Sequence, residues 1–101
     1  MPGYELWSDK ERKELNDVLD NGILMRYGFD GIRKGHWKSK ELEAAICGTF
    51  GCTHAQLTSS GTSALTTAMS ALGIGYGDEI ISPSFTFVAS FEAILSVGAL
   101  P

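Results

Sequence analysis

The sequence predicts an α/β fold in which a parallel-type sheet is flanked by helices. Two short segments, residues 55–58 and 79–83, have the composition of strands, and a proline stops the second. Between them, residues 62–72 place two leucines and a methionine on one face of a helix. A strand, a helix and a strand in this order form a right-handed crossover in nearly all known cases, and such a crossover implies a parallel sheet.

Two further helices are expected before this unit. Ser8 can cap a helix that runs from residue 8 to about residue 21, because Glu11 stands three positions later, in the spacing of a capping box. A second helix over residues 39–50 has apolar residues on one side, and Gly51 can end it.

Glycines punctuate the second half of the chain. Gly73, Gly75 and Gly77 end the helix that starts near residue 62. The last four residues, 98–101, are expected to lead into another strand. A chain of 101 residues that breaks off at this point is expected to be a fragment of a larger domain.

The turn at residues 58–63, with the sequence Thr-Ser-Ser-Gly-Thr-Ser, is a candidate anion site. Unpaired N–H groups and the helix dipole favour a phosphate at the start of a helix. From these residues alone, the alternative is a capped helix start, with Ser59 or Ser60 as the N-cap. Ligands collect at the carboxyl ends of parallel strands. There, residues 83–88 add two aromatic rings, which indicates a phosphorylated ring cofactor.

Four segments, in this order and spacing, resemble the amino-terminal part of the DegT/DnrJ/EryC1/StrS family of sugar aminotransferases. They are residues 59–65, 73–81, 83–90 and 98–101. The resemblance covers essentially all of residues 40–101. It implies a pyridoxal 5′-phosphate (PLP) enzyme of fold type I, like aspartate aminotransferase. Residues 39–101 would begin the PLP-binding large domain, which is incomplete here, and residues 1–38 would form an amino-terminal helix and a substrate-entrance loop.

Within this family, residues 1–6, 26–30 and 37–38 look most like the 8-amino-3,8-dideoxy-manno-octulosonate transaminases. Those enzymes make an amino derivative of Kdo, a lipopolysaccharide sugar. The resemblance implies an amino-acid donor, with glutamate expected, and the C8 aldehyde of a Kdo-type sugar as acceptor. It also implies a homodimer of the full-length protein.

The resemblance assigns the cofactor contacts to Ser60, Gly61, Thr62, Ser63 and Phe87. Backbone N–H groups of Gly61 and Thr62 would hold the phosphate, assisted by the neighbouring hydroxyls. Phe87 would stack on the pyridine ring and keep water away from it, the alternative being core packing. Phe85 is expected in the core.

Residues 22–38 lack a regular pattern and combine basic and aromatic residues, so a loop is expected. In the related enzymes this region lies near the active-site entrance. Arg26 or Arg33 could therefore meet a substrate carboxylate through a bidentate fork, with Tyr27 beside them. The alternative is a solvated basic loop whose aromatic residues are packing anchors.

No catalytic residue of the family is expected in this chain. A PLP transaminase needs a Schiff-base lysine, which lies much later in the family, and residues 41–101 contain no lysine or arginine. The chain alone is therefore expected to be inactive. No metal site is expected either, since Cys47 and Cys52 show no ligand spacing and His36 and His54 have no evident partners.

The composition limits the partners. Hydrophobic residues make up 44% and charged residues 20%, as in globular domains, and the net charge of −4 argues against a nucleic-acid surface. No membrane span is expected, and the cytoplasm is the expected location. Two other functions stay open, a stand-alone phosphate- or nucleotide-binding module and a non-catalytic interaction fragment. The first is disfavoured because residues 59–65 contain neither common glycine-rich nucleotide motif.

Overall fold

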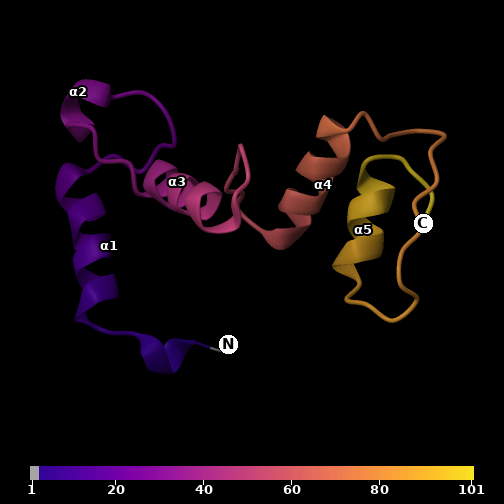
Figure 1. Ribbon diagram of the computed structural model, residues 1–101, viewed down its shortest axis with the longest axis horizontal. Coiled ribbons are helices and arrows are strands. Elements are labelled where there is room, and N and C mark those ends of the chain that lie inside the picture. Colours follow the sequence, from indigo (N-terminus) through magenta and orange to yellow (C-terminus); the bar gives the residue numbers. More distant parts are fainter. Residues whose placement is uncertain (1–2) are drawn as a thin grey trace. The chain divides into compact units, whose positions relative to one another are not determined.

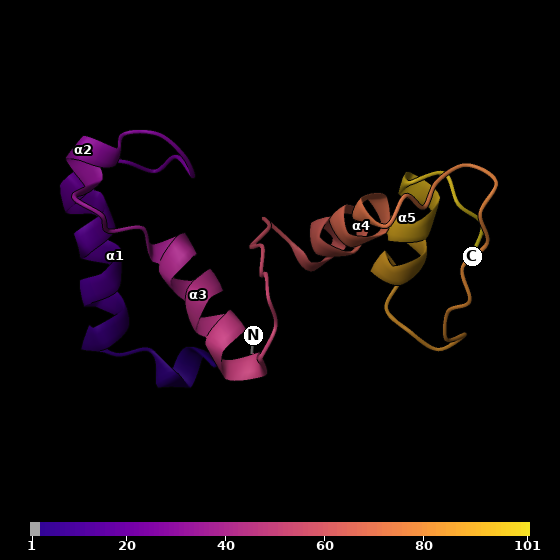
Figure 2. The ribbon, with the colours of Figure 1, turned by 45° about the horizontal axis from the view of Figure 1, so that its top comes forward.

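The computed structural model describes residues 3–101, which divide into two compact units after Gln56. Figures 1 and 2 show the helices of both units. The first unit contains the 3-10 helix η1 (Tyr4–Leu6) and the helices α1 (Asp9–Asn21), α2 (Asp30–Arg33) and α3 (Lys38–Phe50), and the second contains α4 (Gly61–Ala71) and α5 (Ala89–Ser96). The boundary expected between residues 38 and 39 concerns the domains of a larger protein and stays a prediction.

The first long helix, α1, begins and ends where its local signals predict. The backbone N–H of Ser8 donates to Glu11 Oε2 over 2.8 Å, and the Ser8 side chain accepts in return from the backbone of the first turn. This reciprocal pair is the expected capping box. Gly22 ends the helix with a φ of 70°, a left-handed conformation that favours glycine.

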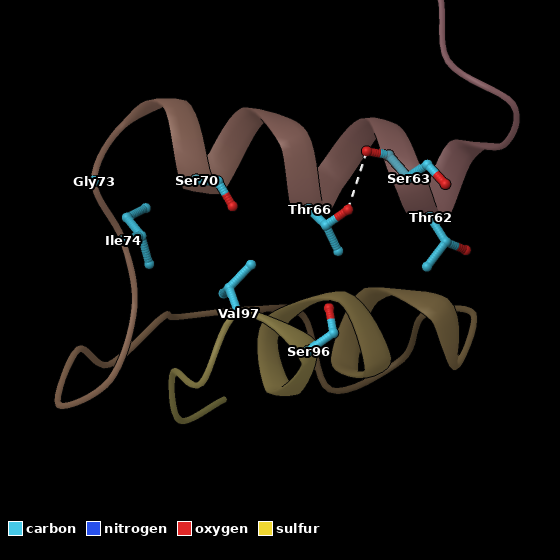
Figure 3. Close-up of a pocket in the computed structure, with 8 residues that line it drawn as sticks. All are labelled: Thr62, Ser63, Thr66, Ser70, Gly73, Ile74, Ser96 and Val97. Atoms are coloured by element: carbon cyan, nitrogen blue, oxygen red, sulfur yellow. Dashed lines mark hydrogen bonds between the residues drawn. The ribbon is translucent and has the colours of Figure 1, made fainter.

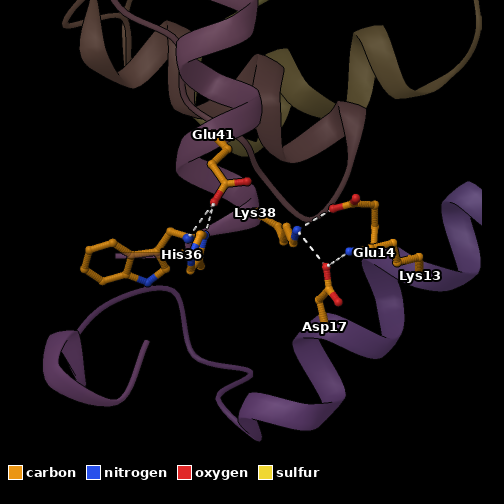
Figure 4. A network of polar contacts seen from close by, with 7 residues as sticks. Lys13, Glu14, Asp17, His36, Lys38 and Glu41 are labelled. Carbon is orange, nitrogen blue, oxygen red and sulfur yellow. Dashed lines mark hydrogen bonds and ion pairs between the residues drawn. The ribbon is translucent and has the colours of Figure 1, made fainter. Parts of the chain in front are cut away.

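One lysine at the start of α3 ties α3 to α1 (Figure 4). Lys38 Nζ pairs with the carboxylate of Glu14 and lies 3.4 Å from Asp17 Oδ2. Lys13 Nζ lies 2.8 Å from the same Asp17 oxygen, so Asp17 is shared between two cations. Helices α1 and α3 are therefore linked by ion pairs between partly exposed side chains, and each such pair contributes little stability.

The segment expected to be a loop, residues 22–38, contains the short helix α2 as well as irregular backbone. His36 Nδ1 lies 3.8 Å from Glu41 Oε1, which makes an ion pair when the imidazole is protonated. Helix α3 is confirmed, and Gly51 ends it with a φ of 67° while its N–H donates to the carbonyl of Cys47 over 2.9 Å.

The second unit packs α4 beside α5, and it contains the buried aliphatic residues of the described chain (Figure 1). These residues are Ala93, Ile94 and Ala99. Helix α4 is close to the expected one. Helix α5 was not expected from the sequence, although residues 89–96 include five apolar positions.

The expected sheet is not formed by residues 3–101, which contain no named strand. One parallel bridge joins Glu79 to Leu100. There, Ile80 N–H donates to the Leu100 carbonyl over 2.8 Å and Leu100 N–H donates to the Asp78 carbonyl over 2.9 Å. A strand needs a neighbouring backbone. The structure assigns no β-bridge to residues 55–58, and the resemblance assigns the rest of the sheet to later residues, so the sheet stays a proposal.

Within residues 3–101, every helix is too short or too polar to cross a membrane.

Candidate functional site

The start of α4 is built around Ser60. Its extended backbone, with φ −158° and ψ 162°, turns the chain into the helix, and its Oγ accepts from the N–H of Ser63 over 3.0 Å. Ser60 Oγ also donates to Ser63 Oγ over 2.9 Å, and Thr58 Oγ1 donates to the Ser60 carbonyl over 2.9 Å. Ser60 is therefore an N-cap, and three hydroxyl side chains fix the turn.

The cap leaves two backbone donors at the start of α4. Within residues 3–101, the N–H groups of Gly61 and Thr62 make no hydrogen bond. The first N–H groups of a helix have no intrahelical acceptor, and an anion can take them. Capping and anion binding are thus compatible here, because the Ser60 side chain accepts from the N–H of Ser63 and leaves the N–H groups of Gly61 and Thr62 free.

Gly61 is a glycine at a position where the described residues leave room for a side chain. A Cβ added there would meet no atom within 4 Å, and the φ of Gly61 is not positive. Neither the backbone conformation nor steric crowding within the described chain therefore requires glycine at position 61. The space beside Gly61 that a side chain would fill is open. We call Ser60, Gly61, Thr62 and Ser63 the phosphate cradle.

A cavity of about 700 Å³ runs from the phosphate cradle along α4 to the end of α5 (Figure 3). It is lined by Thr62, Ser63, Thr66, Ser70, Gly73, Ile74, Ser96 and Val97. Two of its hydroxyls are bound within their own helices, Thr66 Oγ1 to the Ser63 carbonyl over 3.1 Å and Ser96 Oγ to the Ala93 carbonyl over 2.8 Å. The wall is thus mainly hydroxyl and small, and it carries no charge.

Both candidate aromatic residues are exposed. Phe85 has 99% of its surface exposed, so the expectation that it lies in the core is wrong for this chain. The physical reason is that residues 84–87 follow a segment without a sheet to cover it. Phe87 is 78% exposed, which excludes core packing within the described residues and leaves its ring face free to contact a ligand.

The charge of the second unit restricts how it can bind an anion. Residues 41–101 contain no lysine or arginine, so the phosphate cradle offers neutral donors and a helix dipole. Any cation that neutralises a bound phosphate must come from outside residues 41–101. Backbone donors nevertheless suffice to fix the position of the anion.

The expected substrate residues lie in the first unit and have internal partners. Arg26 Nη2 lies 2.6 Å from Glu43 Oε1 on α3 and donates to Gln56 Oε1 over 3.1 Å. Arg33 is buried and donates to two backbone carbonyls. Tyr27 is exposed. The contacts of both arginines were missed from the sequence, because they join residues whose proximity depends on the shape of the loop.

The two thiols show no sign of a reactive site. Partial burial, followed by the hydrogen bond that the Cys47 thiol makes with Cys52, raises the pKa of Cys47, which disfavours the thiolate. Among the residues that the structure describes, no group of three or more His, Cys, Asp or Glu side chains is arranged to hold a metal ion.

A capped helix start that leaves two free N–H groups can accept an anion. The comparison with known families identifies the class of protein. The model of the DegT/DnrJ/EryC1/StrS aminotransferase family matches residues 7–101. The chain therefore belongs to this family.

Three relatives show the range of reactions within the family. GDP-perosamine synthase of Vibrio cholerae is 43% identical over 102 residues, which cover 100% of this chain and 26% of the relative. UDP-N-acetyl-3-dehydro-alpha-D-glucosamine 3-aminotransferase of Acidithiobacillus ferrooxidans is 50% identical over 64 residues, 63% of this chain and 17% of the relative. 3-Amino-5-hydroxybenzoate synthase of Amycolatopsis mediterranei is 32% identical over 100 residues, 99% of this chain and 24% of the relative. The chain thus spans about a quarter or less of the length of these relatives.

Proposed function

We propose that this chain is the amino-terminal part of a PLP-dependent sugar aminotransferase. The parent protein would transfer an amino group from an amino acid to a carbonyl carbon of a sugar. The observation that carries the proposal is the pair of free N–H groups at Gly61 and Thr62, within a segment that matches an aminotransferase family. When bound, PLP supplies the electrophilic aldehyde and the electron-withdrawing ring for this chemistry.

Each residue of the site has a separate role in this proposal. The N–H groups of Gly61 and Thr62 bind the cofactor phosphate, and Ser60 holds them in place by capping α4. Ser63 closes the cap through its hydroxyl. The exposed ring of Phe87 lies against the pyridine face and excludes water from it. Amino transfer itself requires a lysine from outside residues 41–101.

The finer proposals concern the substrates and the assembly. The acceptor is the C8 aldehyde of a Kdo-type sugar for lipopolysaccharide, the donor is glutamate, and the working form is a cytoplasmic homodimer. The motif at residues 26–30 and 37–38 supports this acceptor, because Arg26 can bind a sugar carboxylate. Arg26 forms an ion pair with Glu43, but 38% of the surface of the Arg26 side chain is exposed, so a ligand can reach the guanidinium.

The experiment uses the full-length protein that carries this chain. PLP binding is measured by its absorbance, and amino transfer is assayed with glutamate and a Kdo-type C8 aldehyde. We expect Gly61→Ala to weaken PLP binding about tenfold or more, because the new Cβ enters the space of the phosphate. The stability of the apoprotein should be unchanged or higher, since alanine is a better helix former than glycine by about 1 kcal/mol.

Gly48→Ala is the matched control. Gly48 also lies within a helix, has no positive φ and has no atom within 4 Å of an added Cβ. This variant should share any gain in stability and bind PLP as the unaltered protein does. Unchanged PLP binding by Gly61→Ala would refute the assigned cradle. Binding of nucleotides without PLP would favour the nucleotide-binding module instead.

A further inference from the structure

One buried arginine organises the loop between α1 and α3. Arg33 is 6% exposed, and it is the buried charged residue of the described chain. Its Nε donates to the carbonyl of Gly28 over 3.1 Å, and its Nη2 donates to the carbonyl of Met25. Two arms of one planar guanidinium thus bind two carbonyls of the same loop, which fixes their separation.

An indole ring lies against this guanidinium. Arg33 Cζ is 5.0 Å from the centroid of the Trp37 ring, and Lys40 Nζ is 3.5 Å from it. Both distances are in the range of cation–π attraction. The Trp37 Nε1 atom is buried and has no hydrogen-bond partner within residues 3–101. An unpaired buried donor is unfavourable, and the attraction between the ring and the two cations favours this position of the indole.

The backbone on both sides of α2 is strained. Phe29 and Lys34 have φ values of 62° and 50°, and they are the non-glycine residues with positive φ within the described chain. Such a conformation is unfavourable for residues other than glycine and persists where neighbouring contacts enforce it. Arg33 lies between these two positions and supplies such contacts. We call Arg33, its two carbonyl partners at Met25 and Gly28, and Trp37 the loop clamp.

The loop clamp encloses the two residues proposed to meet the substrate. The carbonyls that Arg33 binds belong to the residues immediately before Arg26 and immediately after Tyr27. The peptide that carries both side chains is therefore held at each end. Arg26 is also tied to α3 through Glu43, while the Tyr27 side chain is exposed.

We propose that Arg33 is a positioning residue for the acceptor sugar: through the loop clamp it fixes the backbone that presents Arg26 and Tyr27. This inference rests on the proposed function for the role of those two side chains. The guanidinium of Arg33 is buried and bonded to carbonyls, so it acts through its neighbours and does not itself touch the substrate. Without the clamp, the loop occupies its binding-competent shape for a smaller fraction of the time, and the apparent affinity falls by that fraction.

The test compares Arg33→Gln with Lys34→Gln in the full-length holoenzyme. Both changes remove one positive charge from α2 and its end, but only Arg33 belongs to the loop clamp. We expect Arg33→Gln to raise KM for the acceptor about tenfold and to leave kcat and KM for the donor within about twofold. Trypsin should cut after Arg26 about tenfold faster, because local opening exposes the loop. Lys34→Gln should change neither quantity.

The outcomes separate this inference from the proposed function. Cleavage after Arg26 needs neither cofactor nor substrate, so an unchanged cleavage rate in Arg33→Gln overturns the loop clamp even if the protein is a transaminase. An equal loss of kcat with both substrates also overturns it, since that indicates a general structural role. Should Arg33→Gln fail to fold, Arg33→Lys keeps the charge but loses the fork, and the clamp predicts the same KM and cleavage effects at smaller size.

Discussion

The unit that ends at Gln56 and the unit that begins at Leu57 bury different side chains. In the described part of the first unit, the buried residue is Arg33, bonded to carbonyls and stacked on an indole. In the second unit the buried residues are Ala93, Ile94 and Ala99. All lysines and arginines of the chain lie at or before Lys40, so the contrast in burial follows a contrast in sequence.

The difference shows two ways to hold a short segment in shape. Charged and cation–π contacts define directions, and they suit a loop that must present particular side chains. Aliphatic burial is without direction, and it suits a helix whose capped start must stay rigid while its N–H groups face a ligand. Each candidate site thus lies in the unit whose contacts match its task.

The largest effect is expected in the aliphatic unit. Ile94→Ala removes the largest buried side chain of α5, which is 4% exposed, and should cost about 2–5 kcal/mol. Faster hydrogen exchange of the α4 and α5 amides would show this, with α1 unchanged. Leu95→Ala is the matched control, because Leu95 is the next residue but 58% exposed, so its effect should be small. Equal effects of both variants would break the comparison.

A smaller effect is expected when charge is removed from the first unit. Lys38→Gln breaks the pairs with Glu14 and Asp17 and should loosen α1 slightly, because exposed ion pairs contribute little stability. Sodium chloride at about 1 M should mimic it by screening, and leave the α5 amides unaffected. Hydrogen exchange measures both. Lys10→Gln is the control, since the Lys10 side chain has no ion pair within the described residues. Salt-sensitive α5 amides would contradict the prediction.

The smallest effect concerns the first turn of α1 in acid. Hydrogen bonds from the Ser8 side chain, and then from the backbone, lower the pKa of Glu11 below its ordinary value of 4.5. Because this pKa is lowered, the contribution of the Glu11 carboxylate to the stability of α1 is complete above pH 4.5. It is lost as the pH falls through the lowered pKa. Amide exchange of residues 8–12 should therefore rise below that pH. In Glu11→Gln the amide keeps the capping box, so this acid step should disappear. Its persistence would assign the step to another group.

The elements that could be predicted from the sequence are those with local causes. Ser8 with Glu11, Gly51 and Ser60 each act within a few residues of themselves, and all three helix ends lie where these residues predict. The proposed phosphate cradle has an equally local basis, because it consists of the first residues of one helix and its N-cap, but its role stays a prediction.

The features that could not be predicted depend on contacts between distant residues. A strand at residues 55–58 requires a neighbouring backbone that residues 3–101 do not supply. Helix α5 is short, and its formation accompanies the burial of Ala93 and Ile94. The loop clamp requires a left-handed phenylalanine at position 29, a conformation that no sequence rule assigns to an aromatic residue.

The parallel bridge between Glu79 and Leu100 restricts the path of the chain between them. Parallel neighbours cannot be joined by a tight turn, so the chain between these residues reverses through α5. A short helix spans less distance per residue than extended chain does. Helix α5 therefore shortens the loop that has to close before the two segments can pair.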